Sequence, residues 1–477
     1  MTLQLDTVEV GVTRAWADDI LPALERFITI PALSPSFDAD WEAHGHIAAA
    51  VDLIADWCRR RPIDGLTVSI EQLPGLTPLV LIDVPAFGAG DPADTVVLYG
   101  HLDKQPEMEG WRDGLGPWTP VLDGDRLYGR GGADDGYAVF ASLVAIEAVR
   151  ASGGSHARCL VVVEASEESG SRDFPAHIDA LAGRIGRPSL VICLDAGALD
   201  YGRLWVTTSL RGLIGGTLTV EILDEGVHSG TASGIVPDSF RIARELLDHI
   251  EDPSSGAVRL EGCYVDIPDD RQREAEAAAD ALGSLPSAEF PFVADARPVD
   301  DDPVDQLMAR TWAPTLTVTG AGGLPPTARA GNVLRPSTSL RLSMRLPPTC
   351  DSTAAVGAIS AGLLADPPYG ASLRFDHVEA ADGWNAPGFA AWLWGALDAA
   401  SLRSFGAPAR AYGEGGSIPF VGMLAARYPD AQFVITGVLG PQSNAHGPNE
   451  FIDLPTARAV TVTIASVLDA HGARGRT

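Results

Sequence analysis

Lysine is almost absent from this 477-residue chain: Lys104 is the only one, and every other fixed cation is arginine. Acidic residues outnumber basic ones, and the formal net charge is -29 at pH 7. A surface of this sign repels nucleic acid and anionic lipid, so we expect neither as a partner. Most of the excess charge is expected to form a solvated acidic surface, although part of it could line a cation site.

Paired cysteines and long apolar runs are also missing. The five cysteines are widely spaced and none lies in a CxxC pair, so we expect reduced thiols and a cytoplasmic location. The N-terminal residues lack a basic start followed by an apolar stretch, so no signal peptide is predicted. No apolar run reaches about 18 residues, the length needed to cross a bilayer, so no membrane contact is expected.

Short apolar runs alternate with helical periodicity in the first part of the chain, which predicts an α/β fold with a mostly parallel sheet and helices on both faces. The predicted strands are 79–84, 95–99, 159–163 and 190–194, and the predicted helices are 13–28, 44–60 and 137–153. After about 207 the strands alternate like half-exposed ones, as in 217–223 and 338–347. We therefore predict a split α/β domain, 1–207 and 381–477, with an inserted α+β domain at 208–380.

Histidines and carboxylates follow the predicted strands. His101 ends one strand, Glu167 and Glu168 follow the next, Asp195 follows a third, and His446 lies in a loop after the predicted strand 431–436. The carboxyl ends of parallel strands meet at one edge of a sheet, where ligands bind. With Asp134 from the segment GRGGADDG and one of the two adjacent glutamates, two histidines and three carboxylates form a ligand set for two divalent ions, Zn²⁺ first, with Mn²⁺ or Co²⁺ as alternatives.

Each of these segments also has a simpler interpretation. Asp103 could hydrogen-bond the ring nitrogen of His101 that faces away from a metal, or it could only cap a turn. Asp134 and its neighbour could simply cap the helix that follows. Glu167 and Glu168 are adjacent, so on extended backbone they point to opposite sides: one could bind metal while the other faces a substrate water.

The motifs GHLD, GRGGADDG, EESGS, LDAG and AHGPNE occur in the order seen in the M20 family of metallopeptidases, and the chain most resembles its carnosine-type dipeptidase branch. The resemblance implies that Asp134 bridges two metals. It implies that one metal site is completed by His101 and Asp195 and the other by Glu168 and His446. It further implies that Glu167 is the general base for a metal-bridging water, with Asp103 orienting His101.

The inserted domain resembles the lid of that family, which carries dimer contacts, so a homodimer is expected. The resemblance implies that His228, in DEGVHSG, stabilises the oxyanion in the partner's active site, and that Arg345 binds a substrate carboxylate, with Asn332 nearby. In AYGEGGSIPF, Glu414 would meet a substrate amine and Gly416 and Ser417 a carboxylate. The simpler interpretations are a surface-turn histidine for His228, an exposed strand residue for Arg345 and a structural turn for the glycine-rich segment.

The activity implied is hydrolysis of the amide bond of dipeptides or short peptides. The alternative is an N-acyl-amino-acid amidohydrolase of the same family, and a third hypothesis is a non-catalytic binding protein that keeps the fold. The chain departs from the family where Gly136 replaces a common lysine and where Lys104 follows Asp103. Neither position is an implied ligand, so the departures concern substrate preference.

Overall fold

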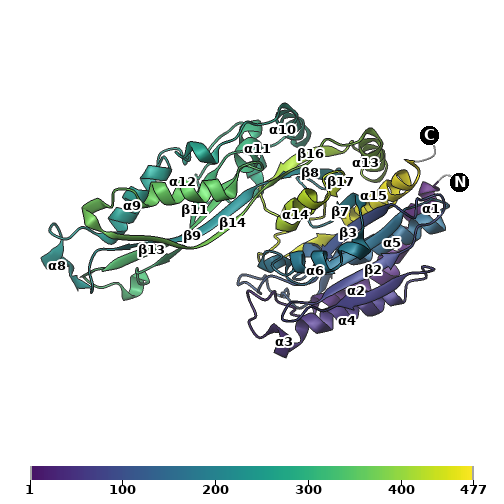
Figure 1. Cartoon of the computed structure of the whole chain (residues 1–477), viewed down its shortest axis with the longest axis horizontal. Coiled ribbons are helices and arrows are strands. Elements are labelled where there is room, and N and C mark those ends of the chain that lie inside the picture. Colours follow the sequence, from purple (N-terminus) through teal and green to yellow (C-terminus); the bar gives the residue numbers. More distant parts are fainter. Residues whose placement is uncertain (1–2, 475–477) are drawn as a thin grey trace. The chain divides into compact units, whose positions relative to one another are not determined.

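The computed structural model describes residues 3–474 (Figure 1). The chain forms two compact units. One comprises the residues up to 208, 386–412 and those from 423 onward; the other comprises 209–385 and 413–422. The return of 413–422 to the second unit was not among the predicted boundaries.

A mixed sheet forms the centre of the first unit, in the order β1-β2-β6-β3-β7-β17-β8. Its strands are β1 (Thr67–Glu71), β2 (Leu79–Val84), β3 (Thr95–His101), β6 (Arg158–Glu164), β7 (Pro188–Cys193), β8 (Trp205–Leu210) and β17 (Gln432–Ile435). The neighbours β6, β3, β7 and β17 are parallel, whereas β1, β2 and β8 pair in antiparallel fashion. The predicted α/β class is confirmed, but the sheet is mixed and not mostly parallel. The sequence could not predict strand direction, because an apolar run indicates burial and not direction.

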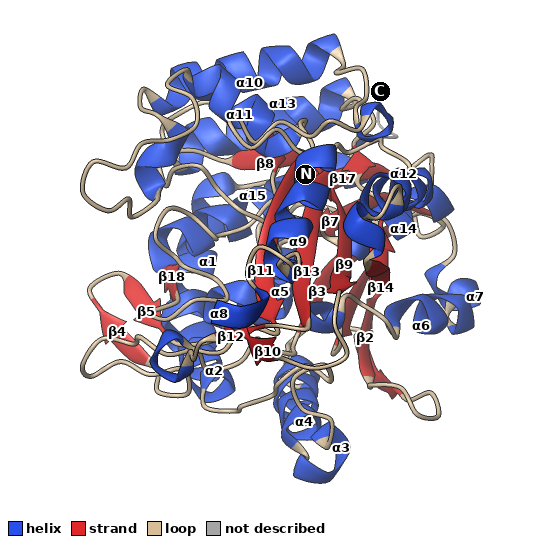
Figure 2. Cartoon of the chain, turned by 90° about the vertical axis from the view of Figure 1, so that its left-hand side faces the viewer, coloured by secondary structure: helices blue, strands red, loops and turns tan. Residues whose placement is uncertain are grey.

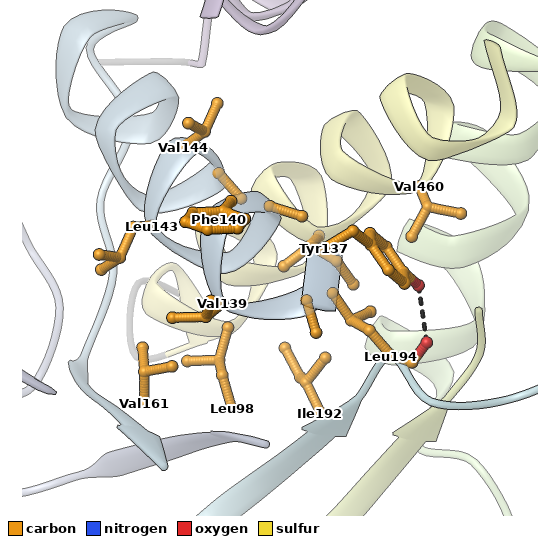
Figure 3. Close-up of a cluster of buried hydrophobic side chains, with 14 of the residues drawn as sticks. Leu98, Tyr137, Val139, Phe140, Leu143, Val144, Val161, Ile192, Leu194 and Val460 are labelled. Carbon is orange, nitrogen blue, oxygen red and sulfur yellow. Dashed lines mark hydrogen bonds between the residues drawn. The ribbon is translucent and has the colours of Figure 1, made fainter. Parts of the chain in front are cut away.

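Helices cover both faces of this sheet. On one face, α5 (Tyr137–Ala151) places Phe140 and its neighbours over apolar side chains of β3, β6 and β7 (Figure 3). The Tyr137 hydroxyl donates to the Leu194 carbonyl at 2.6 Å, which ties the start of α5 to the end of β7 (Figure 3). On the other face, Phe174 of α6 (Phe174–Ala180) packs edge-on against Tyr99 of β3. Cover on both faces explains why β3 is buried along its whole length.

The N-terminal helical region begins earlier than the predicted 13–28. It consists of α1 (Leu5–Ala15), one π-helical turn (Trp16–Ile20) and α2 (Leu21–Ile28). Gly11 and several β-branched residues lower the helix propensity of α1, but burial of Val8 and Val12 stabilises it. The other elements of the first unit are α3 (Trp41–His44), α4 (His46–Arg59), β4 (Val121–Asp123), β5 (Arg126–Tyr128), α7 (Ala182–Ile185), α13 (Ala391–Ser404), β18 (Phe451–Asp453) and α15 (Leu454–Gly472). Two elements, β16 (Arg410–Glu414) and α14 (Pro419–Arg427), each include residues of both units.

The second unit contains an antiparallel sheet in the order β11-β13-β9-β14, with α9 and α12 packed on one face (Figure 1). The bounds are β9 (Gly212–Glu221), β11 (Thr315–Gly322), β13 (Ser337–Leu346), β14 (Ser372–Ala381), α9 (Ser239–Ile250) and α12 (Ser352–Leu364). Alternate residues of β13 are buried against the helices, as its alternating sequence predicts.

A short strand pair lies beside α8 (Ser229–Ala232) in this unit (Figure 2). The pair is formed by β10 (Val227–His228) and β12 (Val333–Leu334). The remaining elements are α10 (Asp269–Leu282), α11 (Pro303–Thr311) and β15 (Trp384–Asn385), which pairs with the end of β8. Within residues 3–474, no helix combines the length and apolar composition that crossing a bilayer requires.

Candidate metal centre

Four adjacent parallel strands bring the predicted ligands to one edge of the first unit's sheet. β3 ends at His101, β6 is followed by a short helical turn with Glu167 and Glu168, and Asp195 comes two residues after β7. β17, the next strand in the sheet, leads into the loop that carries His446. The convergence follows from the parallel pairing of β6, β3, β7 and β17, because parallel strands present their carboxyl ends together.

Asp134 lies between the two histidines. Its Oδ1 is 3.2 Å from Nε2 of His101, and its Oδ2 is 3.1 Å from Nε2 of His446. Asp195 approaches the same nitrogen of His101 at 3.8 Å, and Glu168 approaches that of His446 at 3.3 Å. The side chains therefore form two groups that share one carboxylate.

The helix-capping interpretation of Asp134 does not hold. The α5 helix begins at Tyr137, its N-cap residue is Gly136, and no side chain caps it. Asp134 instead directs both carboxylate oxygens at imidazole nitrogens. The neighbouring Asp135 accepts a hydrogen bond from the main-chain N–H of His101 at 3.4 Å, and its other oxygen is buried without a partner among the described residues.

Asp103 lies against both the His101 ring and the Glu167–Glu168 turn. The Nδ1 of His101 lies 3.1 Å from the main-chain carbonyl oxygen of Asp103 and 3.6 Å from its carboxylate. That carboxylate accepts hydrogen bonds from the main-chain N–H groups of Glu167 and Glu168, at 3.1 and 3.0 Å. Asp103 thus contacts the His101 ring most closely through its backbone carbonyl, with its carboxylate slightly farther away, and fixes the Glu167–Glu168 turn through its side chain.

The centre contains more buried carboxyl groups than basic side chains. Burial raises the pKa of Glu167, Glu168 and Asp195 well above the usual range, with the neighbouring carboxylates adding to the effect and His101 opposing it. Burial also opposes ionisation of Asp134, but hydrogen bonds to His101 and His446 outweigh it and lower its pKa. Buried carboxylates need a counter-charge, and carboxylate oxygens with imidazole nitrogens are the donors that divalent cations such as Zn²⁺ use. The residues present fit such ions.

Distance alone does not separate Glu167 from the ligands. One donor atom each of His101, Glu167 and Asp195 lies within 4.8 Å of the others, and the same is true of His101, Asp134 and Glu168. Glu167 is thus close enough either to coordinate an ion or to act on a molecule beside it.

The predicted substrate-binding residues lie in the second unit and form two groups there. In the first, β10 and β12 place His228 opposite Val333, and the Asn332 carbonyl accepts a hydrogen bond from the Ser229 N–H at 3.0 Å. Both His228 and Asn332 are exposed.

The second group lies around the glycine-rich segment. Arg345 donates to the Ser417 hydroxyl at 2.9 Å, and that hydroxyl donates to the carbonyl of Arg211. Arg211 in turn donates from its N–H to the Gly416 carbonyl at 3.0 Å. Glu414, half-buried at the end of β16, begins the same segment.

Sequence reasoning assigned no role to several residues that contact these groups. Arg211 is buried, and burial together with Arg345 and Arg310 lowers its pKa to about 10. Gln105 donates to the Glu168 carboxylate at 2.7 Å, and Arg130 pairs with Glu450 at 2.6 Å. Three of these residues, Gln105, Arg130 and Glu450, lie within or next to the motifs that carry the resemblance. A charged or amide side chain inside such a motif was the signal from which a supporting role could have been predicted.

Known proteins provide an independent comparison. The family model described as Peptidase family M20/M25/M40 matches residues 97–470. A cysteinylglycine-S-conjugate dipeptidase of Corynebacterium striatum is 28% identical over 400 residues, which span 80% of this chain and 82% of that protein.

Solved structures agree on the fold. A dipeptidase of Saccharomyces cerevisiae superposes with a TM-score of 0.78 at 22% identity, covering 99% of both chains. Human carnosine dipeptidase 1 superposes with a TM-score of 0.76 at 20% identity, covering 98% of this chain and all of the other (100%). Together with a family match that extends from β3 to α15, this shows that the chain is a peptidase and belongs to family M20/M25/M40.

Proposed function

We propose that this protein is a two-metal dipeptidase, in which Asp134 is the shared ligand. The observation that carries the proposal is the position of Asp134, whose two oxygens each lie against a different histidine. On this basis one ion is held by His101, Asp195 and Asp134, and the other by His446, Glu168 and Asp134. Zn²⁺ is the proposed metal, with Mn²⁺ or Co²⁺ as alternatives.

Glu167 is proposed as the general base. Divalent ions bound at this centre would polarise the scissile carbonyl and lower the pKa of a shared water. Glu167 then takes a proton from the attacking water and returns it to the leaving amine. Its position is fixed by Asp103, whose carboxylate binds the N–H groups of Glu167 and Glu168.

The second unit is proposed to bind the ends of the substrate. Arg345 supplies a guanidinium suited to a carboxylate, and Ser417 and the backbone near Gly416 lie beside it. Glu414 is proposed to meet the free amine, and His228, with Asn332 beside it, to stabilise the oxyanion of a partner subunit. Homodimer formation through this unit and a cytoplasmic location stay predictions.

A substrate panel tests the activity. We expect the metal-loaded enzyme to hydrolyse free dipeptides, including Cys-Gly and β-Ala-His, faster than N-acetyl amino acids, because Glu414 can pair only with a free amine. The measurement is release of amino acids with Zn²⁺, Mn²⁺ or Co²⁺ supplied in turn. Hydrolysis of N-acetyl amino acids without hydrolysis of any dipeptide would instead identify the deacylase alternative.

Replacement of Arg345 tests the carboxylate site. We expect Arg345→Met to raise KM by about 10- to 100-fold, the usual effect of losing a hydrogen bond to a charged group, with a smaller change in kcat. Arg341→Met is the matched control, because Arg341 lies four residues away on β13 and instead binds the His377 carbonyl. Equal KM values for the two variants would contradict the assignment.

A further inference from the structure

Arg130 and Glu450 form a buried ion pair next to the candidate metal centre. Their exposed fractions are 1% and 0%, and Nη1 of Arg130 lies 2.6 Å from the Glu450 carboxylate. Neither residue is among the proposed ligands or the proposed base. A buried pair of this kind is a weak source of stability, because desolvation offsets much of the attraction. Stability alone therefore does not explain why this pair is buried here.

The pair connects the three segments that carry His101, Asp134 and His446. Arg130 donates to the carbonyl of Pro106 at 3.2 Å and to the carbonyl of Gly447 at 2.8 Å. The Glu450 carboxylate accepts from the N–H groups of Gly131 and Ala133, at 3.0 and 3.3 Å. One ion pair thus binds the residue after His446, the residue before Asp134 and the loop that follows His101.

The His446 loop needs such support. The His446 side chain is 58% exposed, so little packing holds it. His446 has φ +65°, and Gln442, Asn444 and Asn449 also have positive φ values of 66°, 56° and 63°. This left-handed conformation is uncommon for residues other than glycine, although Asn and His adopt it more readily than most, so four such residues within one short loop need surrounding contacts to hold them. The bonds from Arg130 to Gly447 and from Glu450 to the Asp134 segment provide these contacts beside His446.

We propose that Arg130 and Glu450 are positioning residues that hold His446 opposite Asp134 and Glu168. The inference rests on the proposed two-metal function and adds that the two ions depend unequally on this pair. The ion held by His446 and Glu168 requires it. The other ion shares Asp134 and so depends on the pair in part, but it depends on it less, because His101 ends the fully buried strand β3.

The variants to compare are Glu450→Gln, Arg130→Met and the double variant Arg130→Met/Glu450→Met. Glu450→Gln keeps an acceptor for Gly131 and Ala133 but removes the charge opposite Arg130. The double variant removes both charges, so it leaves no buried unpaired ion to unfold the protein. Arg158→Met is the control: it breaks the Arg158–Asp83 pair of the same unit, which lies at the other end of β6.

The main measurement is Zn²⁺ stoichiometry and affinity by isothermal titration of the 477-residue apo chain, together with thermal unfolding in EDTA. We expect two ions in the wild type and in Arg158→Met. In the three pair variants we expect one ion to stay tight and the second to weaken by about 10- to 100-fold, as typical for residues that orient a ligand. kcat should fall with the loss of the second ion, and excess Zn²⁺ should restore it in part.

The outcomes separate the two claims. Two ions with wild-type affinities in the double variant would overturn the positioning role, even if that variant were less stable in EDTA. Equal weakening of both ions would also overturn it. Fewer than two ions in the wild type would overturn the proposed two-metal function, and this inference with it.

Discussion

Glu167→Gln is expected to reduce kcat by about 100- to 10,000-fold, the usual contribution of a general base, while the protein still binds two metal ions. Glutamine has the same size, so packing around the site is preserved. It also adds no buried charge, and burial already disfavours ionisation of Glu167. The measurements are steady-state kinetics on a dipeptide and metal content after gel filtration.

Metal content is the decisive part of this test. Glu167 has a donor atom within 4.8 Å of donors on His101 and Asp195, so its position is also compatible with coordination. If Glu167→Gln loses an ion together with its activity, Glu167 is a ligand and the assignment as base is wrong. A variant with full activity would exclude both roles.

Glu164→Gln is the matched control. Glu164 is buried in the same segment, and burial raises its pKa to about 7. Its carboxylate accepts hydrogen bonds from Tyr99, Ser166 and Ser171, and none of these is a proposed ligand. We expect this variant to retain two ions and most of its activity, which separates the loss of a base from the loss of any buried carboxylate.

Much of the site could be predicted because its ligands follow apolar strands. β3, β6 and β7 are recognisable as buried runs, and His101, Glu167 and Asp195 follow directly at their ends. Strand direction was not recognisable: β2 is as apolar as β3 but pairs with β6 in antiparallel fashion. Hydrophobicity reports burial on both faces of a strand, whereas direction depends on the connection and on neighbours far along the chain.

Two contacts near the site could not be predicted from the sequence. The spacing of Asp103 from His101 suggested a side-chain contact, but the main-chain carbonyl lies nearer the ring. The pairing of Arg130 with Glu450 joins residues 320 positions apart. Both residues were visible within motifs, but only the fold shows that they are partners, because no periodicity relates such distant positions.

Asp134→Asn is expected to have the largest effect on metal binding. Two divalent ions held by groups that share Asp134 would repel each other, and the negative charge of Asp134 would offset part of that repulsion. An amide keeps the shape but supplies one oxygen and no charge. We therefore expect at most one tightly bound ion, and activity below detection at metal concentrations that saturate the wild type.

Asp135→Asn provides the comparison for this variant. Asp135 is its chain neighbour and equally buried, but it binds the main-chain N–H of His101 and not an imidazole nitrogen. Burial raises its pKa well above the usual range, so a neutral amide resembles its protonated form. Titration with Zn²⁺ should find two ions in Asp135→Asn. Two ions of unchanged affinity in Asp134→Asn would mean that the two groups of side chains do not share this carboxylate.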